Sequence, residues 1–230
     1  MNHLKKKIPE FDEYSKDYKK LLTNSFPKLF RQIEYYTEYK IKKIFNLRKN
    51  LKTKKILDFG CGIGMSFNFL FKYFPTAKIW GYDNSSFSIK QIKKKLSFRL
   101  NLTSNLNKIP KKYFDVIIVA NVFHHIKHNE HKKTLNILKK LLNKNGAIYI
   151  FEHNKLNPIT NIIFSNSYLD RYAKMVPLNN FYLNSKKCNM RITKKIYTLY
   201  FPKLLSFLNI FEKFINWIPL GAQYLIVLKK

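Results

Sequence analysis

Short apolar runs alternate with longer segments of helical spacing through the middle of the chain. The apolar runs predict strands at 55–58, 78–83, around 98–100, at 114–120 and at 147–151. The segments between them carry apolar residues three and four positions apart, which predicts helices at 65–74, 86–96 and about 130–142. Strands that alternate with helices of this length indicate a largely parallel sheet with both faces covered.

Two details of this pattern lead to local expectations. Helix 65–74 places four larger apolar residues on one side, which we expect to be its buried face: Met65, Phe69, Leu70 and Tyr73. The dipeptide Asn145-Gly146 is a signal for the end of a helix and a turn, so we expect it to separate helix 130–142 from the last of these strands.

Residues 8–50 show helical spacing of apolar residues and hold no glycine. We interpret this segment as a helical lid in front of the sheet that contributes to a substrate pocket. The alternative is that it only adds to the core.

The alternation of strands and helices stops after residue 153. Residues 192–201 alternate enough to form a strand, and 223–228 is a short apolar strand, so the two could pair as an antiparallel arm at the sheet edge. Between them, 203–217 shows a broad apolar face at helical spacing. We expect this helix to pack on the sheet; the alternative is that it lies on an anionic membrane, with Lys203 and Lys213 near its edges.

A turn with glycine at every second position follows the first strand, in the stretch Lys55-Ile-Leu-Asp-Phe-Gly-Cys-Gly-Ile-Gly64. Glycine tolerates positive φ and lets a ligand approach the main chain, so this turn predicts a nucleotide-binding corner. Asp83 ends the second strand, 19 residues after Gly64, where its carboxylate could accept hydrogen bonds from both hydroxyls of a ribose. The alternative role for Asp83 is a helix N-cap. NAD is disfavoured as the ligand because it would prefer the longer GxGxxG spacing.

The formal net charge is +31, from 44 basic and 13 acidic residues. A field of that sign attracts phosphates, nucleic acid or anionic lipid. Codon bias in an A/T-rich genome is the other explanation. The lysines are scattered in twos and threes, so we expect a small anionic substrate and peripheral contact with an anionic membrane rather than a nucleic-acid partner.

The two cysteines, Cys61 and Cys188, lie far apart without metal-ligand spacing, which predicts neither a zinc site nor a disulfide and suits a reducing cytoplasm. The sequence has no apolar secretory core near its beginning and no apolar stretch of the roughly 20 residues needed to span a bilayer. We therefore expect a cytoplasmic protein, peripheral to the inner membrane, without a bound metal.

The stretch 56–64 resembles motif I of the class I S-adenosylmethionine-dependent methyltransferases, and Gly81-Tyr82-Asp83 resembles their acidic second motif. Residues 114–117 with 121–125 are similar to the fourth-strand motif, and Asn145-Gly146 to the turn before strand five. This resemblance covers about 50–152. It implies an α/β, Rossmann-like doubly wound fold, with a mostly parallel seven-stranded sheet, an antiparallel C-terminal strand, an N-terminal helical lid and an insertion after strand five.

The resemblance also implies the domain organisation and the cofactor. We expect a single methyltransferase domain over 1–230, divided into the lid (1–50), the cofactor-binding core (51–153), a substrate-side insertion (154–222) and the final strand (223–230). The implied methyl donor is S-adenosyl-L-methionine, bound by Asp58, Gly60, Cys61, Gly62, Gly64, Asp83, Asn84, Asn105, Asn121 and Val122. Many relatives carry an acid after the third strand that contacts adenine, where this chain has Ser104 and Asn105.

A more local resemblance points to a subgroup. Phe151-Glu-His-Asn154 with Asn157-Pro158, and the stretches 201–202 and 219–224, look like a bacterial subgroup of small methyltransferases of surface-polysaccharide and lipid-linked sugar biosynthesis. The subgroup reads Glu-His-Asn-Pro after strand five, whereas Lys155 replaces the proline here.

Three histidines just beyond strand ends are the candidates for the catalytic base: His124, His125 and His153. Histidine accepts protons near neutral pH, and we favour His125 or His153. The alternative for the adjacent pair is a structural role that closes the turn. Glu152 could orient a histidine, bind an acceptor hydroxyl or be a plain surface acid. In the insertion, Tyr168, Asp170 and Arg171 could select the acceptor.

The predicted function is methyl transfer to an O or N atom of a sugar or phosphorylated metabolite in surface-glycan biosynthesis. Two alternatives remain: an RNA or protein methyltransferase, and a non-catalytic partner protein at a membrane surface. The chain lacks an Asn-Pro-Pro-Tyr-type base-flipping motif after strand four, which disfavours the first, and its intact glycines and Asp83 disfavour the second.

Overall fold

The computed structural model describes residue 23, residues 31–92 and residues 100–230. The strands are β1 (Lys55–Phe59), β2 (Lys78–Tyr82), β3 (Leu100–Thr103), β4 (Phe114–Ala120), β5 (Leu142–His153), β6 (Arg191–Thr198) and β7 (Gln223–Lys229). The α-helices are α2 (Ile33–Leu47), α3 (Phe67–Tyr73), α4 (Ser86–Gln91), α5 (His131–Leu141), α6 (Pro158–Ser165), α7 (Leu178–Lys187) and α8 (Glu212–Ile215). Short 3₁₀ helices are η3 (Leu106–Lys108), η4 (Phe123–His125), η5 (His128–Glu130), η6 (Tyr168–Asp170) and η7 (Lys203–Phe211).

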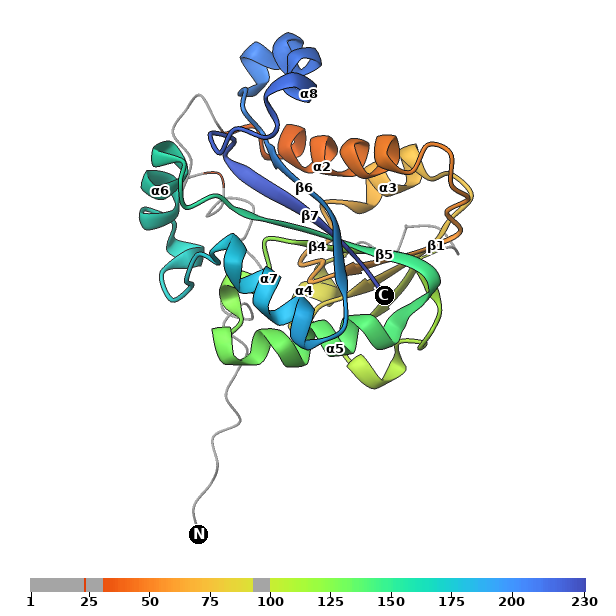
Figure 1. Cartoon of the computed structure of the whole chain (residues 1–230). Coiled ribbons are helices and arrows are strands. Elements are labelled where there is room, and N and C mark those ends of the chain that lie inside the picture. Colours follow the sequence, from red (N-terminus) through yellow and green to blue (C-terminus); the bar gives the residue numbers. More distant parts are fainter. Residues whose placement is uncertain (1–22, 24–30, 93–99) are drawn as a thin grey trace.

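The seven strands form one sheet in the order β3-β2-β1-β4-β5-β7-β6 (Figure 1). The first five run parallel, and β7 pairs antiparallel with both β5 and β6. The predicted fold, a Rossmann-like mostly parallel sheet with an antiparallel C-terminal strand, is confirmed. Successive strands are added on one side of β1 up to β3 and on its other side from β4 onward. Ligands of such sheets bind beyond the carboxyl ends of the strands, at the point where this order reverses.

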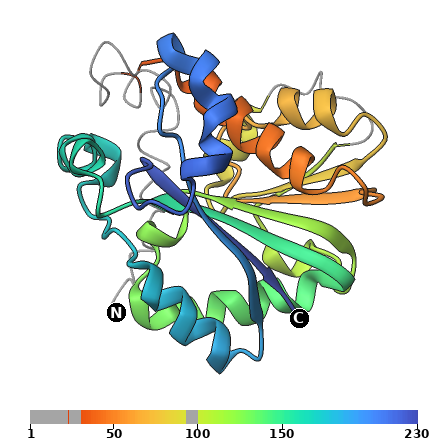
Figure 2. The same cartoon turned by 45° about the horizontal axis from the view of Figure 1, so that its top comes forward.

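Helices cover both faces of the sheet. On one face α2 and α3 pack against inward residues such as Ile56, Val116 and Tyr149, and on the other α5 and α7 pack against residues such as Leu57, Ile117 and Ile148 (Figure 2). Successive residues of one strand therefore enter opposite cores. This explains why the central strands read as continuous apolar runs rather than as alternating ones.

Several predicted bounds need correction. The predicted helix at 65–74 begins at Phe67, and its buried residues are Phe67 and Leu70, not Met65 or Phe69. Met65 remains in the preceding glycine turn. The third strand is Leu100–Thr103, later than predicted, and positions 98 and 99 of the prediction lie outside the described residues. Helix α4 ends at Gln91; residues 93–96 of its predicted range also lie outside them, as do residues 8–22 and 24–30 of the N-terminal helical pattern.

The turn predicted at Asn145-Gly146 lies inside β5 instead of before it. Helix α5 ends at Leu141, and β5 begins at once with Leu142 opposite Phe114, after which the pairing resumes at Ala147 opposite Val116. The residues between bulge out of the ladder, and the Asn145 amide donates to the Asn143 side chain. The turn signal was therefore correct locally, but the turn forms a bulge within the strand.

The prediction for 203–217 was wrong on two counts. The segment is the 3₁₀ helix η7, interrupted by non-helical angles at Leu205, followed by the single turn of α8. Its large apolar side chains do not pack on the sheet: Phe207, Phe214 and Trp217 are each at least 65% exposed. The buried residue of the segment is Glu212, at 1% exposure.

Candidate active site

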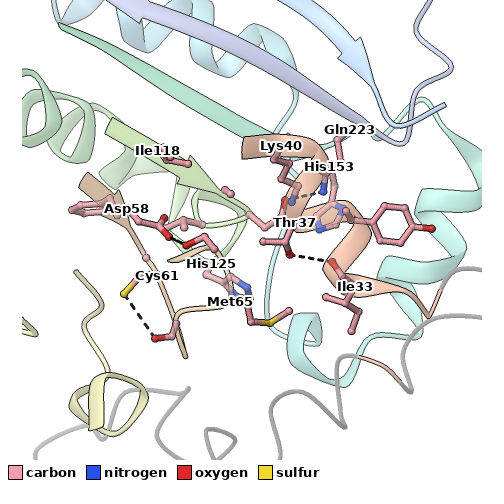
Figure 3. Close-up of a pocket in the computed structure, with 18 of the residues that line it drawn as sticks. Ile33, Thr37, Lys40, Asp58, Cys61, Met65, Ile118, His125, His153 and Gln223 are labelled. Carbon is pink, nitrogen blue, oxygen red and sulfur yellow. Dashed lines mark hydrogen bonds between the residues drawn. The ribbon is translucent and has the colours of Figure 1, made fainter. Parts of the chain in front are cut away.

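A cavity of about 520 Å³ opens at the carboxyl ends of β1, β2 and β4. This volume lies within the range of about 300–1,000 Å³ that is usual for small-ligand sites. Its lining comes from the glycine turn after β1, the tips of β2, β4 and β5, the helices α2 and α6, and the 199–202 segment (Figure 3). Of the predicted cofactor-binding residues it includes Asp58, Gly60, Cys61, Gly62, Asp83, Asn84, Asn121 and Val122.

The glycine turn has the backbone conformation that its sequence predicts. Gly60, Gly62 and Gly64 have φ angles of +81°, +52° and +78°, which L side chains rarely adopt. A Cβ on Gly60 would lie 2.4 Å from the Val122 side chain, whereas one on Gly62 would meet no atom within 4 Å. Gly62 thus presents bare main chain toward open space in the cavity wall.

Gly64 and Asn105 lie elsewhere. A Cβ on Gly64 would lie 2.7 Å from the Phe67 ring, so this glycine permits close packing of α3 and does not line the cavity. Asn105 is exposed and begins η3, where its side chain accepts from the Asn107 amide. The next residue, Leu106, lines the cavity instead. The cavity wall after β3 is therefore apolar, and the predicted contact from Asn105 is not formed by a residue that lines the cavity.

Asp83 lies at the tip of β2, directly beside the glycine turn. Its two oxygens accept from the amides of Gly62 (2.8 Å) and Ser85 (2.9 Å). The N-cap of α4 is Ser85, whose side chain accepts from the Ser88 amide at 3.0 Å. The alternative capping role of Asp83 is therefore filled by another residue, and the Asp83 carboxylate lines the cavity.

A second carboxylate and an ammonium group also line the cavity. Asp58, at the end of β1, accepts a hydrogen bond from the Ser66 hydroxyl. Burial and the nearby charge of Asp83 raise the pKa of Asp58 to about 6, although Ser66 and Lys40 oppose that shift. Lys40 reaches in from α2, and burial lowers its pKa to about 8 against the attraction of Glu152 and Asp58.

The tip of β4 is fixed by its own side chains. Asn121 has a φ of +58°, which asparagine tolerates better than most residues, and its side-chain oxygen accepts from Gln223 at 2.9 Å. The next two amides, of Val122 and Phe123, both donate to Glu152, at 3.0 and 2.7 Å. Glu152 is fully buried, so it is neither a surface acid nor free to bind an acceptor; it holds the turn after β4.

His124 lies between two carboxylates. Its Nδ1 is 2.7 Å from Glu152 and its Nε2 3.2 Å from Asp170. Burial opposes the charge of this imidazole, but the two acids outweigh burial and raise the pKa of His124 to about 9. His124 is 3% exposed and does not line the cavity. The geometry therefore gives this member of the pair the structural role.

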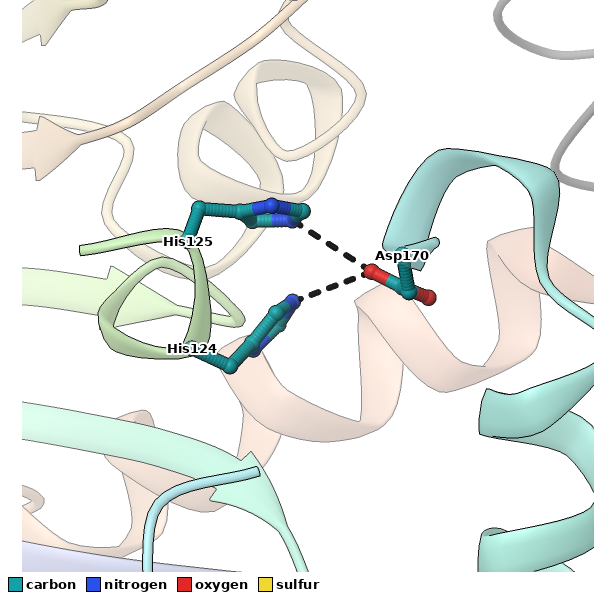
Figure 4. A group of neighbouring side chains, drawn as sticks. All are labelled: His124, His125 and Asp170. Carbon is teal, nitrogen blue, oxygen red and sulfur yellow. Dashed lines mark hydrogen bonds and ion pairs between the residues drawn. The ribbon is translucent and has the colours of Figure 1, made fainter. Parts of the chain in front are cut away.

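His125 and His153 both line the cavity. The Nε2 of His125 is 3.3 Å from Asp170. The same carboxylate oxygen of Asp170 therefore contacts the Nε2 atoms of both His124 and His125 (Figure 4). Burial, and then the positive charge of His124, lower the pKa of His153 to about 4, which keeps its imidazole neutral. These two histidines remain the candidates for a proton acceptor.

Two features of the site were not foreseen. The helical segment expected as a lid does line the cavity through α2, but Tyr36, Thr37 and Lys40 were not named as site residues, because polar side chains within an amphipathic helix look like its solvent face. Asp170 was expected to select the acceptor but binds the histidine pair. His124, His125 and Asp170 place potential ligand atoms within 4.8 Å of one another, yet their mutual hydrogen bonds account for the arrangement without a metal.

Comparison with known proteins agrees with this architecture. Residues 57–148 match the methyltransferase domain family. An uncharacterized protein of Rickettsia prowazekii is 34% identical over 119 residues, which cover 48% of this chain and 47% of the relative. A match in Haemophilus influenzae is of similar extent, so the chain spans about half the length of these curated relatives.

Solved structures share the whole fold at low sequence identity. A SAM-dependent methyltransferase from Archaeoglobus fulgidus superposes with a TM-score of 0.66 at 19% identity, over 87% of this chain and 96% of that one. A plantazolicin methyltransferase in complex with S-adenosylhomocysteine gives a TM-score of 0.59 at 18% identity, over 95% and 93%. In the described part of this chain, no helix is long and apolar enough to cross a membrane. Residues 57–148 therefore resemble a methyltransferase domain, and the chain shares its fold with SAM-dependent methyltransferases of known structure.

Proposed function

We propose that this chain transfers a methyl group from S-adenosylmethionine to a small-molecule acceptor. The observation that carries the proposal is a single cavity that brings together the bare main chain of Gly62, the carboxylate of Asp83 and two histidines. A methyl transfer to an O or N atom needs a site for the donor and a proton acceptor beside it, and the position of these residues at one edge of the sheet supports that assignment.

The cavity offers partners for the ribose and for the amino-acid portion of the donor. Asp83 would accept hydrogen bonds from the ribose hydroxyls, and the main chain of Gly60 and Gly62 would lie against the amino-acid portion. Asp58 and Lys40 form a pair of opposite charges that suits the ammonium and carboxylate of a free amino acid. S-adenosylmethionine supplies a methyl group already activated on a sulfonium. The protein has to align the acceptor with that methyl group, shield both from water and accept the proton of the acceptor.

The proton of an O- or N-linked acceptor would pass to a histidine. His153 is neutral over the physiological range, because burial and His124 depress its pKa, and it lines the cavity together with His125. Asp170 holds the His125 ring through its Nε2. Apolar residues from α2 and α6, among them Ile33 and Ile163, line the same space and would limit access of water.

For the acceptor we propose a sugar or phosphorylated metabolite of surface-glycan biosynthesis. The resemblance of 151–158 and 219–224 to enzymes of that kind supports this class, and the net charge of +31 favours an anionic molecule. The acceptor would reach the histidines past Thr160 and Tyr200, which line the cavity near α6.

A transfer assay with radiolabelled S-adenosylmethionine tests this acceptor class. Nucleotide sugars, lipid-linked sugars and tRNA are offered separately to the wild type and to Asp83→Ala. We expect label on a sugar acceptor, and at least about tenfold less with the variant, because an interaction worth about 1.4 kcal/mol changes a rate or affinity tenfold. Label only on tRNA or on protein would overturn the proposed acceptor and support the macromolecular alternative.

A further inference from the structure

The segment 203–220 presents apolar side chains outward. Leu204 is 72% exposed and Trp217 70%, and the large apolar side chains between them that are more than half exposed are Phe207, Ile210, Phe211 and Phe214. Leu220 continues the series. A concentration of large apolar residues of this kind on a protein surface marks an interaction site rather than ordinary surface composition.

Polar contacts on the inner side of the segment fix this orientation. Glu212 is buried, and the Lys43 ammonium, 2.8 Å away, and the Tyr39 hydroxyl of α2 bind it. The Asn209 side chain donates to the Tyr35 hydroxyl at 2.7 Å. The segment is therefore amphipathic in the reverse of the usual sense: its acid and amide point into the protein and its aromatic residues point away.

A second exposed apolar group adjoins the first. At and before α6, Leu156, Ile159 and Ile162 are each at least 50% exposed. The Asn154 and Asn157 side chains donate to the carbonyls of residues 219–221, at 2.6 to 2.9 Å, and so connect the two segments. We call the exposed apolar residues of 156–162 and 204–220 the apolar rim (Figure 1, upper left and top).

The exposed charges on the two segments that carry the rim are positive. Within 154–169 and 199–222 the only acidic residue is the buried Glu212, whereas Lys155, Lys203 and Lys213 are exposed. A second copy of this chain would bring another charge of +31 to the contact, which disfavours self-association. An apolar surface with an exposed Trp and flanking lysines suits the interface of an anionic bilayer, where lysines extend toward the headgroups.

The rim also borders the cavity on one side. Ile159 of the rim lines the cavity, as do Tyr200, Phe201 and Pro202, which lead directly into η7. We propose that the apolar rim docks on the surface of an anionic lipid bilayer and turns the cavity mouth toward the headgroup layer. Docking does not depend on the proposed methyl transfer; if both hold, the acceptor is an amphipathic molecule whose polar group lies in that layer.

Sedimentation with lipid vesicles tests the proposal on the full chain. Vesicles of phosphatidylcholine alone are compared with vesicles that also contain phosphatidylglycerol. We expect the wild type to bind the anionic vesicles, less at high salt, and the combined variant Phe207→Ser/Phe214→Ser/Trp217→Ser to bind at least about tenfold more weakly. The matched control is Tyr182→Ser/Leu183→Ser, which removes exposed apolar residues of α7 outside the rim and should bind like the wild type.

Tryptophan fluorescence gives a second readout. The chain has two tryptophans, of which Trp80 is half-buried beside Phe114 and Trp217 is exposed. A blue shift on anionic vesicles should therefore disappear in Trp217→Phe. Should the serine variant lose its near-UV circular dichroism, Lys203→Glu/Lys213→Glu takes its place and should also lose binding to anionic vesicles.

Three results would overturn the proposal. The first is equal binding of the wild type to neutral and anionic vesicles. The second is unchanged binding by the rim variants. The third is a doubled mass in solution that the rim variant abolishes without any vesicle binding, which would identify the rim as a contact between copies. Loss of S-adenosylhomocysteine binding would concern the proposed function alone and leave docking standing.

Discussion

At the scale of single residues, Lys40 and Asp58 place one positive and one negative charge in the wall of the cavity. A lysine with a pKa of about 8 and an aspartate with a pKa of about 6 both carry less stable charges than they would in water, because burial penalises ions. Each would regain stability from an opposite charge. A ligand that carries both an ammonium and a carboxylate supplies the two at once.

Lys40→Met should weaken the binding of S-adenosylhomocysteine by about tenfold or more, since the variant loses a buried charge pair with the carboxylate. It should leave the binding of methylthioadenosine, which lacks the amino-acid portion, unchanged within about twofold. Lys42→Met, an exposed lysine on the same helix, is the matched control. Equal losses for both ligands would mean that Lys40 supports the fold of the cavity and does not contact the carboxylate.

At the scale of elements, one buried acid joins the turn after β4 to β5. Glu152 accepts two amides of η4 and holds His124, and His124 in turn binds Asp170 of η6. Three elements far apart in sequence therefore depend on one protonated imidazole. Removing one partner of such a buried ion pair leaves the other charge buried without compensation. This destabilises the fold more than replacing both partners by apolar residues would.

This arrangement predicts a pH-dependent contribution to stability. The pKa of His124 is about 9 in the folded chain and near 6.5 unfolded, so its contribution is complete below pH 6.5 and disappears as pH rises through 9. The difference in free energy of unfolding between wild type and His124→Gln should therefore shrink over that window, by about 3 kcal/mol in order of magnitude. Denaturant unfolding at several pH values measures it, and a difference that stays constant with pH would exclude a charged His124. Comparing the two proteins cancels the opposite trend that Lys40 contributes above pH 8.

The elements also show what the sequence could and could not predict. Strands β1, β4 and the core of β5 follow from apolar runs, because both faces of these strands are buried, whereas β2 alternates between buried and more exposed residues. The helical spacing of apolar residues in 203–217 was equally clear, yet the apolar face of this segment points outward. The reason is that Tyr39 and Lys43 bind Glu212, which turns the polar side of the segment inward. Periodicity finds an apolar face but does not say what covers it.

At the scale of the whole molecule, the strand order explains why part of the site was predictable. Asp58 and Asp83 end adjacent parallel strands, so their meeting at one sheet edge follows from topology alone. Lys40 and Asp170 enter from α2 and η6, whose positions depend on tertiary packing, and no spacing in the sequence relates them to the glycine turn. The residues at the strand ends were therefore predictable, whereas those that enter from packed helices were not.

The central claim is that the glycine turn and Asp83 together bind the adenosyl group. Calorimetric titration with S-adenosylhomocysteine tests it most directly, with Glu130→Ala, an exposed acid outside the cavity lining, as the matched control. Wild type and Glu130→Ala should bind alike, and Asp83→Ala should bind about 10- to 100-fold more weakly, since hydrogen bonds to a charged group are each worth about 1.5–3 kcal/mol. No binding by the wild type, or equal binding by Asp83→Ala, would contradict the account.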